Sequence, residues 1–196
     1  LVGIGDQAGA QALYRVALSG AIYWYPLGFS SSSPRATGLC PPYQDWIAFS
    51  GVVPSVNSSD SLYRMRRDGT AVTRIAAGLR EPAPLIDGRI VASNGTEVVV
   101  IDPATGGQSV VTRFGAEQLT ASSPIGLENG DLAYIVDGWI YTQAPVLDAP
   151  ATVLLAGSDA MALFWDPSGY IIFEEGGDLL ALDLEFTISP VVETSG

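Results

Sequence analysis

Short apolar runs alternate with turns rich in Asp, Asn, Gly and Pro along most of the chain. The stretch from Glu97 to Phe114, EVVVIDPATGGQSVVTRF, shows the unit as an apolar strand, a tight turn and a second apolar strand. Gly accepts positive φ, Pro presets φ, and Asp or Asn bonds its own backbone, so these residues favour turns. The pattern predicts β-hairpins, and no long stretch has the spacing of an amphipathic helix.

The hairpin recurs with a period of about 40 residues. The leading apolar residue of each copy is Ile47, Ile90, Leu132 or Ile171. A turn precedes each of them, and before that turn lies a short fourth strand in the sequences ATGLCPP, EPAPLI, SSPIGL and AMALFW. This period is typical of a propeller blade of four strands. The N-terminal segment LVGIGDQAGAQALYRVALSGAIYWYPLG is a fifth copy that lacks the innermost strand.

The predicted fold is therefore all-β. We expect a β-propeller of about five four-stranded blades, the first without its inner strand, or a segment of a larger propeller; an irregular sandwich or barrel is the alternative. A single domain over residues 1–196 is predicted. Its blades cover about 1–28, 36–77, 80–115, 120–156 and 158–195, and the Ser-rich stretch at 28–38 joins the first two.

Composition excludes several kinds of chemistry. The nine basic residues are all Arg, His is absent, and Cys40 is the single thiol. A Ser-His-Asp triad, a Lys Schiff base, a His- or Cys-rich zinc site and an internal disulfide therefore cannot form within this sequence. We expect no cofactor. The net charge of −12 argues against nucleic acid. Arg64, Arg66 and Arg67 are interpreted as a solvated strand face, with an anion site as the alternative.

Asp and Glu remain as candidates for chemistry. Asp45, Asp87, Asp131 and Asp166 recur before the first strand of each copy, which favours a role in turns over catalysis. Glu174 and Glu175 break the repeat symmetry, and they are either a solvated pair or an acid/base or metal site. The Asn94-Gly95 pair predicts a hairpin turn.

The N-terminal copy carries the candidate protein interface. Tyr23, Trp24 and Tyr25 are consecutive, so both faces of their strand carry aromatic side chains. The missing inner strand leaves the first strand, with Leu1, Val2 and Ile4, as an open edge that invites pairing with another chain. The sequence begins without Met, as in a processed or trimmed chain, and no apolar run approaches the roughly 20 residues of a membrane span.

The sequence WIAFSG…SLYRMRRDGTAVTRIA resembles the TolB-like repeat, also called the WD40-like or PD40 repeat. DPSGYIIF matches its turn loosely, and VVVIDPATGG is similar to YVTN and quinoprotein repeats. No Trp follows DPATGG, so the resemblance does not extend to a quinone cofactor. It implies an extracytoplasmic protein (periplasmic, cell-surface or secreted) that serves as a platform for partner proteins.

The function predicted from these features is a non-enzymatic scaffold that binds a protein partner or assembles with itself through an open blade edge. The alternative is a carboxylate-based carbohydrate-active enzyme, a glycosidase or lyase, or a sugar-binding propeller. A glycosidase needs two non-equivalent acids close to each other at the channel.

Overall fold

A computed structural model describes residues 2–7, 10–16, 22–26, 36–43, 46–53, 57–66, 68, 70–114, 119–166, 168–183 and 187–191. Side chains are described at 46–51, 61–66, 68, 70–114, 119–166, 168–183 and 187–191.

Nineteen strands and no helix make up the secondary structure of the described residues. They form five separate sheets in which neighbouring strands pair antiparallel in chain order. The first sheet has three strands, β1 (Val2–Gln7), β2 (Ala10–Val16) and β3 (Ile22–Pro26). Each of the other sheets has four. The prediction of an all-β propeller of about five blades, the first with three strands, is confirmed.

The four-stranded sheets follow one another along the chain. The second contains β4 (Ala36–Tyr43), β5 (Trp46–Val53), β6 (Asn57–Arg66) and β7 (Thr73–Ala77). The third contains β8 (Arg80–Pro84), β9 (Ile90–Ser93), β10 (Glu97–Ile101) and β11 (Gln108–Arg113). The fourth contains β12 (Ala121–Gly126), β13 (Leu132–Val136), β14 (Trp139–Gln143) and β15 (Thr152–Leu155). The fifth contains β16 (Leu163–Asp166), β17 (Tyr170–Glu175), β18 (Asp178–Asp183) and β19 (Ile188–Pro190).

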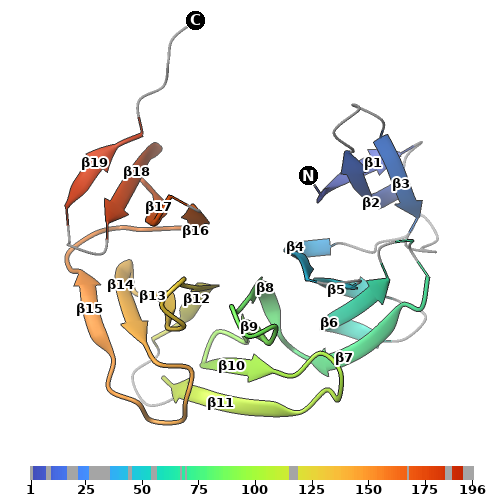
Figure 1. Cartoon of the computed structure of the whole chain (residues 1–196), viewed down its shortest axis with the longest axis horizontal. Helices are drawn as coiled ribbons and strands as arrows, with labels where there is room; N and C mark the ends of the chain where they lie inside the picture. Colours follow the sequence, from blue (N-terminus) through green and yellow to red (C-terminus); the bar gives the residue numbers. More distant parts are fainter. Residues whose placement is uncertain are drawn as a thin grey trace, which may run out of the picture.

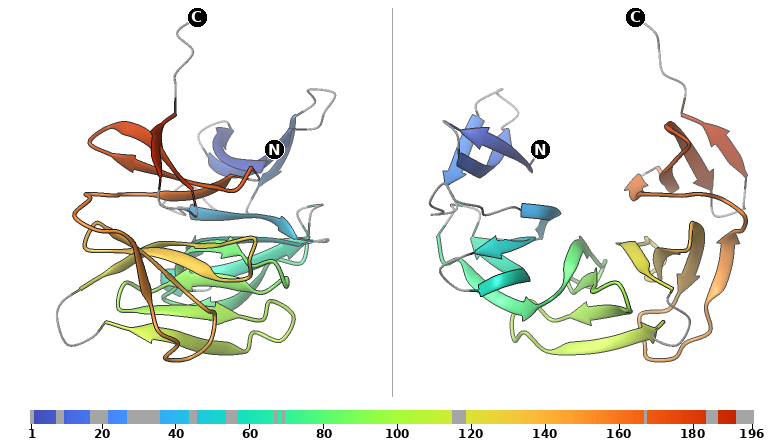
Figure 2. Two further views of the ribbon diagram at one scale, coloured as in Figure 1. Left: turned by 60° about the vertical axis from the view of Figure 1, so that its left-hand side comes forward. Right: turned by 180° about the vertical axis from the view of Figure 1, so that it is seen from behind.

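The five sheets stand side by side in an open arc (Figure 1). Strands β4, β8, β12 and β16 are the inner strands, and β4 contacts β8, β8 contacts β12, and β12 contacts β16. The first and last sheets lie at the two ends of the arc, with the open side between them, which is also clear from behind (Figure 2). This arrangement leaves one face of the last sheet without a neighbouring sheet.

The hydrophobic core lies between the sheets rather than inside any one of them. Successive side chains of a strand point to opposite faces, so each sheet contributes one set of apolar residues to the sheet before it and another to the sheet after it. Three buried clusters follow, between the second and third, third and fourth, and fourth and fifth sheets. All five residues of β13 are buried because both of its faces are covered.

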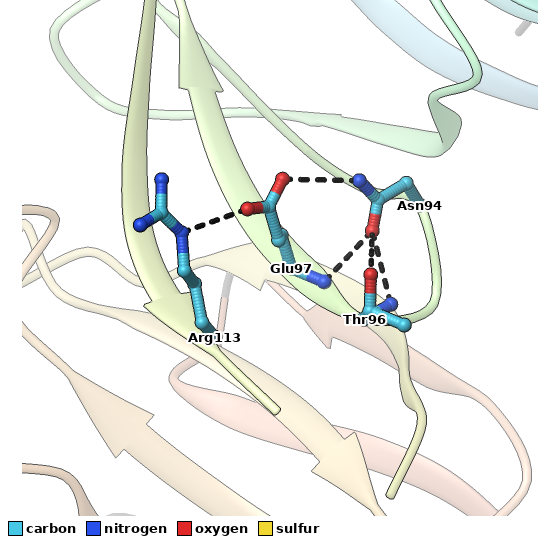
Figure 3. Close-up of polar contacts among 4 residues, drawn as sticks. All are labelled: Asn94, Thr96, Glu97 and Arg113. Carbon is cyan, nitrogen blue, oxygen red and sulfur yellow. Dashed lines mark hydrogen bonds and ion pairs between the residues drawn. The ribbon is translucent and has the colours of Figure 1, made fainter. Parts of the chain in front are cut away.

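Turn chemistry fixes the hairpins in the predicted way. In the third sheet the Asn94 Oδ1 accepts from the amides of Thr96 (2.9 Å) and Glu97 (2.8 Å) and from the Thr96 hydroxyl, and Asn94 Nδ2 donates to Glu97 (Figure 3). Arg113 Nε on β11 then donates to the same Glu97 carboxylate at 2.8 Å. The turn therefore holds the start of β10 against the end of β11, which confirms the hairpin predicted at Asn94-Gly95.

The second and third strands of the four complete sheets share one pairing register. The leading apolar residues pair as Ile47–Met65, Ile90–Ile101, Leu132–Gln143 and Ile171–Leu182. Three residues further along, the equivalent pairs are Ser50–Leu62, Ser93–Val98, Ile135–Ile140 and Glu174–Leu179. Position-by-position comparison of the sheets is therefore possible from hydrogen-bond register alone.

Candidate functional site

The outer face of the fifth sheet is the candidate functional surface, and we call it the terminal face. Leu163, Ile171, Phe173 and Leu182 point toward the fourth sheet and are buried against it. Strand alternation puts the neighbouring residues on the opposite face. The terminal face consists of Phe164, Asp166, Tyr170, Ile172, Glu174, Leu179, Ala181 and Asp183.

Residues equivalent to Ile172, Glu174 and Leu179 of the terminal face are buried in the inner sheets. Leu179 is 48% exposed, whereas its counterparts Leu62, Val98 and Ile140 are fully buried. Phe164 is 57% exposed, and Ile125, which holds the same register position on β12, is 7% exposed. The residue type is apolar in each case, so the difference comes from the missing cover. Exposed contiguous apolar surface of this kind marks an interaction site.

Glu174 is the charged residue of the terminal face that lies beside Leu179, whereas Asp166 and Asp183 pair with Tyr170 at the other end of the strands. Its counterpart in the fourth sheet is the buried Ile135, and in the second and third sheets it is a buried serine. One of these serines, Ser93, accepts from the Gly95 amide at 2.9 Å and donates to the Ala121 carbonyl at 2.7 Å. The side chain at this position therefore makes polar contacts across the junction between two sheets. In the fifth sheet, Glu174 places a carboxylate there, which can accept hydrogen bonds.

Main-chain hydrogen bonds join each hairpin turn to the connector that leads into the next sheet. The Ala121 amide donates to the Gly95 carbonyl at 2.7 Å at the junction of the third and fourth sheets. The Ala160 amide donates to the Gly138 carbonyl at 3.1 Å at the next junction, and the Ser158 hydroxyl donates to that carbonyl at 2.5 Å. Sheet packing is thus accompanied by a polar contact at the turn between the second and third strands.

The corresponding turn of the fifth sheet, Gly176-Gly177, has no such contact. Within the described residues neither of its carbonyls receives a hydrogen bond. A Cβ placed on Gly138 would lie 2.4 Å from the Ser158 carbonyl oxygen, whereas a Cβ on Gly177 would meet nothing within 4 Å. The Gly176-Gly177 turn therefore resembles the turn at Gly138 that binds the connector of the fifth sheet. Its carbonyl oxygens, however, receive no hydrogen bond within the described residues.

A second concave site lies at the inner strands. A cavity of about 680 Å³ is lined by residues 81–86, 123–128 and 162–165, from β8, β12 and β16 and the residues that adjoin them. Its walls are mostly apolar, with Trp165 and Phe164 on β16 and the acids Glu81 and Glu128 at β8 and just after β12. The cavity lies on the axial side of the arc, at the inner strands of three sheets.

Two strained residues meet at the wall of this cavity. Glu81 (φ 51°) and Ser123 (φ 48°) both adopt left-handed backbone, and each lies where the pairing of its inner strand shifts register. The Ser123 amide donates to the Glu81 carboxylate at 2.5 Å. Left-handed conformation costs a non-glycine residue roughly 1–2 kcal/mol, so the surrounding structure holds these residues in place. Sequence reasoning did not single out either of them.

The predicted acids divide into turn residues and a pair at the last sheet. The Asp87 carboxylate accepts from the Arg89 amide at 3.0 Å and Asp166 from the Ser168 amide at 2.8 Å, which confirms their turn role. Asp45 lies outside the described residues. Glu175 accepts from the Asp159 amide at 3.0 Å, and neither Glu174 nor Glu175 lines the axial cavity. Among the described residues no group of three or more His, Cys, Asp or Glu could hold a metal.

The basic cluster on β6 is only partly a solvated face. The Arg64 guanidinium is half-buried, lies 4.6 Å from the centre of the Trp46 ring and donates to the Pro103 carbonyl on the neighbouring sheet. Arg66 is exposed, with its guanidinium 5.8 Å from the same ring. Arg67 lies outside the described residues. Arg64 therefore acts as a contact between the second and third sheets, because its planar head fits an aromatic face and carbonyl oxygens.

The residues of the predicted interface are placed by backbone only. Val2 and Ile4 lie on β1, and Tyr23, Trp24 and Tyr25 lie on β3, where they pair with Arg15, Tyr14 and Leu13 of β2. Their side chains, and Leu1 altogether, lie outside the described residues. Sequence reasoning missed the terminal face, although the repeat alignment contained the signal: the last copy keeps apolar residues at the positions that face the following sheet.

Solved structures with the same fold include enzymes and an extracellular domain. The chain superposes on virginiamycin B lyase from Staphylococcus aureus with a TM-score of 0.66 at 12% identity, covering 94% of this chain and 64% of the lyase. It matches a gluconolactonase from Xanthomonas campestris with a TM-score of 0.65 at 14% identity, covering 91% and 66%. An extracellular domain from B. thetaiotaomicron, described as part of a hybrid two-component system, matches with a TM-score of 0.62 at 11% identity, covering 94% and 26%.

These likenesses establish the propeller fold, and the chain spans less than two thirds of the length of the solved propellers named above. No protein-family model matches the sequence, and no curated protein matches it. In the ranges that the structure describes, no helix has the length and apolar character needed to cross a bilayer.

Proposed function

We propose that this chain is a non-enzymatic, extracytoplasmic propeller segment of the TolB-like type that acts as a binding scaffold. Its terminal face packs against another polypeptide. The observation that carries the proposal is the exposure of Leu179 at a position that is buried in every other complete sheet. Burying apolar surface stabilises association by about 25 cal/mol per Å², so such a face gains free energy whenever a partner covers it.

The non-enzymatic part of the proposal rests on composition, since this sequence contains no His and no Lys. The similar structures include virginiamycin B lyase and a gluconolactonase, which favour the alternative enzyme hypothesis. The extracytoplasmic part is supported by the extracellular domain among the similar structures. The blade boundaries and the single domain predicted from the repeat remain part of the proposal.

Binding of an apolar dye, 8-anilinonaphthalene sulfonate, tests the proposed surface. The variant Leu179→Glu places a charge on the terminal face at a residue that does not line the axial cavity, and we expect it to lower dye fluorescence several-fold. The matched control Leu147→Glu changes an exposed leucine in the loop between β14 and β15, and it should leave the fluorescence unchanged. Equal dye binding by the parent protein, the terminal-face variant and the control would contradict the proposal that the terminal face is a binding surface.

The first sheet carries a second proposed surface on the same scaffold. Tyr23, Trp24 and Tyr25 stay candidates for a protein contact because three consecutive aromatic residues cannot all face one side of β3. If dye binding persists in Leu179→Glu but falls in Trp24→Ser, the binding surface is at the first sheet instead.

A sugar-binding or carboxylate-based activity is the second candidate, and the axial cavity favours it. The cavity brings together two acids in different settings, since Glu81 is half-buried and bonded to Ser123 whereas Glu128 is exposed. Trp165 supplies an aromatic wall of the kind on which sugar rings stack. Calorimetric titration with neutral oligosaccharides tests this candidate. Binding that is weakened by Glu81→Gln, together with hydrolysis lost in Glu128→Gln, would favour it over the scaffold.

A further inference from the structure

We infer that the partner of the terminal face is a complete four-stranded propeller blade, and that this blade places a hydrogen-bond donor opposite Glu174. The inference rests on the proposed function, since it names the partner of the same surface. It follows from comparing the terminal face with the three internal junctions, where the covering element is known.

The first argument is the pattern of apolar positions. At the junction of the fourth and fifth sheets, Ile125, Ala133 and Ile140 are covered by Leu163, Ile171 and Phe173 of the next sheet. The terminal face repeats the covered half of this junction, with Phe164, Ile172 and Leu179 in the equivalent places. The terminal face is therefore complementary to a sheet face that carries branched and aromatic residues on alternate positions of its inner strands.

The second argument is the open turn. At two junctions a turn carbonyl accepts an amide hydrogen from the connector that leads into the covering sheet, Gly95 from Ala121 and Gly138 from Ala160. The Gly176-Gly177 turn offers the same acceptors, and the space beside Gly177 is free. A blade with its connector supplies an amide there, whereas a partner that contributes only side chains leaves the carbonyls unpaired.

The third argument separates a further blade from a second copy of this chain. Two terminal faces pressed together would leave the Gly176-Gly177 carbonyls unpaired, because the connector that carries the Ala160 amide lies on the opposite side of the fifth sheet, against Gly138. In the described residues the first sheet has three strands, whereas each of the three internal junctions is covered by a four-stranded sheet. A complete blade meets both requirements, and the open side of the arc beside β16–β19 is where it would stand (Figure 1).

Glu174 adds a requirement for the partner's chemistry. The equivalent serines fit because a hydroxyl both donates and accepts, as Ser93 does. A carboxylate only accepts, and an unpaired charge buried between sheets is strongly unfavourable. The natural blade therefore presents an Arg, Lys or other donor where the internal junctions need none.

The experiment extends the chain by one blade of known structure. Residues 156–191, which include the connector and the fifth sheet, are repeated after Val191, once with Glu174 retained and once with Glu174→Ser in the original sheet. We expect hydrogen exchange of the β17 and β18 amides to slow about tenfold in the Glu174→Ser form. The gain should be smaller with Glu174 retained, because the added blade carries no side-chain donor placed for it.

Matched substitutions show whether the terminal face carries the gain. Leu179→Asp in the original sheet should abolish the added protection, and Val146→Asp, on an exposed loop, should leave it intact. Unchanged exchange, equal gains with Glu174 and Ser, or an extended chain that aggregates would overturn the inference.

Light scattering on the 196-residue chain distinguishes a failure of this inference from a failure of the proposed function. A dimer that Leu179→Asp dissociates would make a second copy the occupant, which overturns the inference while the proposed scaffold stands. A monomer that shows neither dye binding nor added protection removes both.

Discussion

The Ala160 amide donates a hydrogen bond of 3.1 Å to the Gly138 carbonyl, and this contact ties the connector of the fifth sheet to the turn of the fourth. The two residues come from different repeats, so the bond acts between blades. Its geometry depends on a turn residue without a side chain, because the Ser158 carbonyl lies where a Cβ of residue 138 would be.

Substitution of that glycine should therefore be costly. Gly138 has φ of 79°, and Gly138→Ala adds a clash to the left-handed strain; we expect a loss of at least about 2 kcal/mol in the free energy of unfolding. Gly177→Ala is the matched control, since Gly177 has φ of 93° and open space around it, and it should lose only about 1 kcal/mol. Urea denaturation measures both, and equal losses would contradict a packed junction at Gly138.

The equivalence of Ile140 and Leu179 gives a second prediction. Ile140→Ala removes buried methyl groups between two sheets and should cost about 2–5 kcal/mol. Leu179→Ala changes a half-exposed residue at the same register position and should cost less than about 1 kcal/mol. Thermal or urea unfolding of the two variants checks the contrast. Similar losses would mean that something covers Leu179 in the isolated protein.

Ser93 links two repeats through one buried hydroxyl. Ser93→Ala leaves the Gly95 amide and the Ala121 carbonyl without this partner, so we expect a loss of about 1–3 kcal/mol. Ser109→Ala, at an exposed position of β11, should be near neutral. Urea unfolding compares the two serine variants. A neutral Ser93→Ala would show that water replaces the hydroxyl at this junction.

The fold could be predicted from the sequence because its signals are local. Asp, Asn and Gly mark the turns, and Ile47, Ile90, Leu132 and Ile171 mark the repeat, so strand order follows from short-range chemistry. The turns and their spacing can be recognised without any knowledge of contacts between residues that are far apart in the sequence.

The functional surfaces were not predictable in the same way because they depend on which sheets are covered. Val98, Ile140 and Leu179 are the same kind of residue in the same place, and only the arrangement of sheets makes one of them accessible. The contact of Glu81 with Ser123 likewise joins two inner strands that are far apart in sequence. The contact requires left-handed backbone at Glu and Ser residues, which rarely adopt it, and no local sequence pattern predicts that conformation.

Acid should weaken the DPATGG turn. The Asp102 carboxylate accepts from the Ala104 amide at 2.8 Å and from the Thr105 hydroxyl at 2.9 Å, and these hydrogen bonds hold its pKa below the usual 3.8. A carboxyl whose pKa is depressed by folding stabilises the protein above its unfolded pKa, and that contribution is lost as pH falls through the lower, folded pKa. Asp102→Asn should therefore be less stable than the parent near neutral pH, and the difference should shrink below about pH 4.

Urea unfolding at a series of pH values measures this difference in stability. Asp178→Asn, which alters an exposed carboxylate without a hydrogen-bond partner in the described residues, is the control. A constant difference between Asp102→Asn and the parent across the acid range would show that the turn gains nothing from the charge of Asp102.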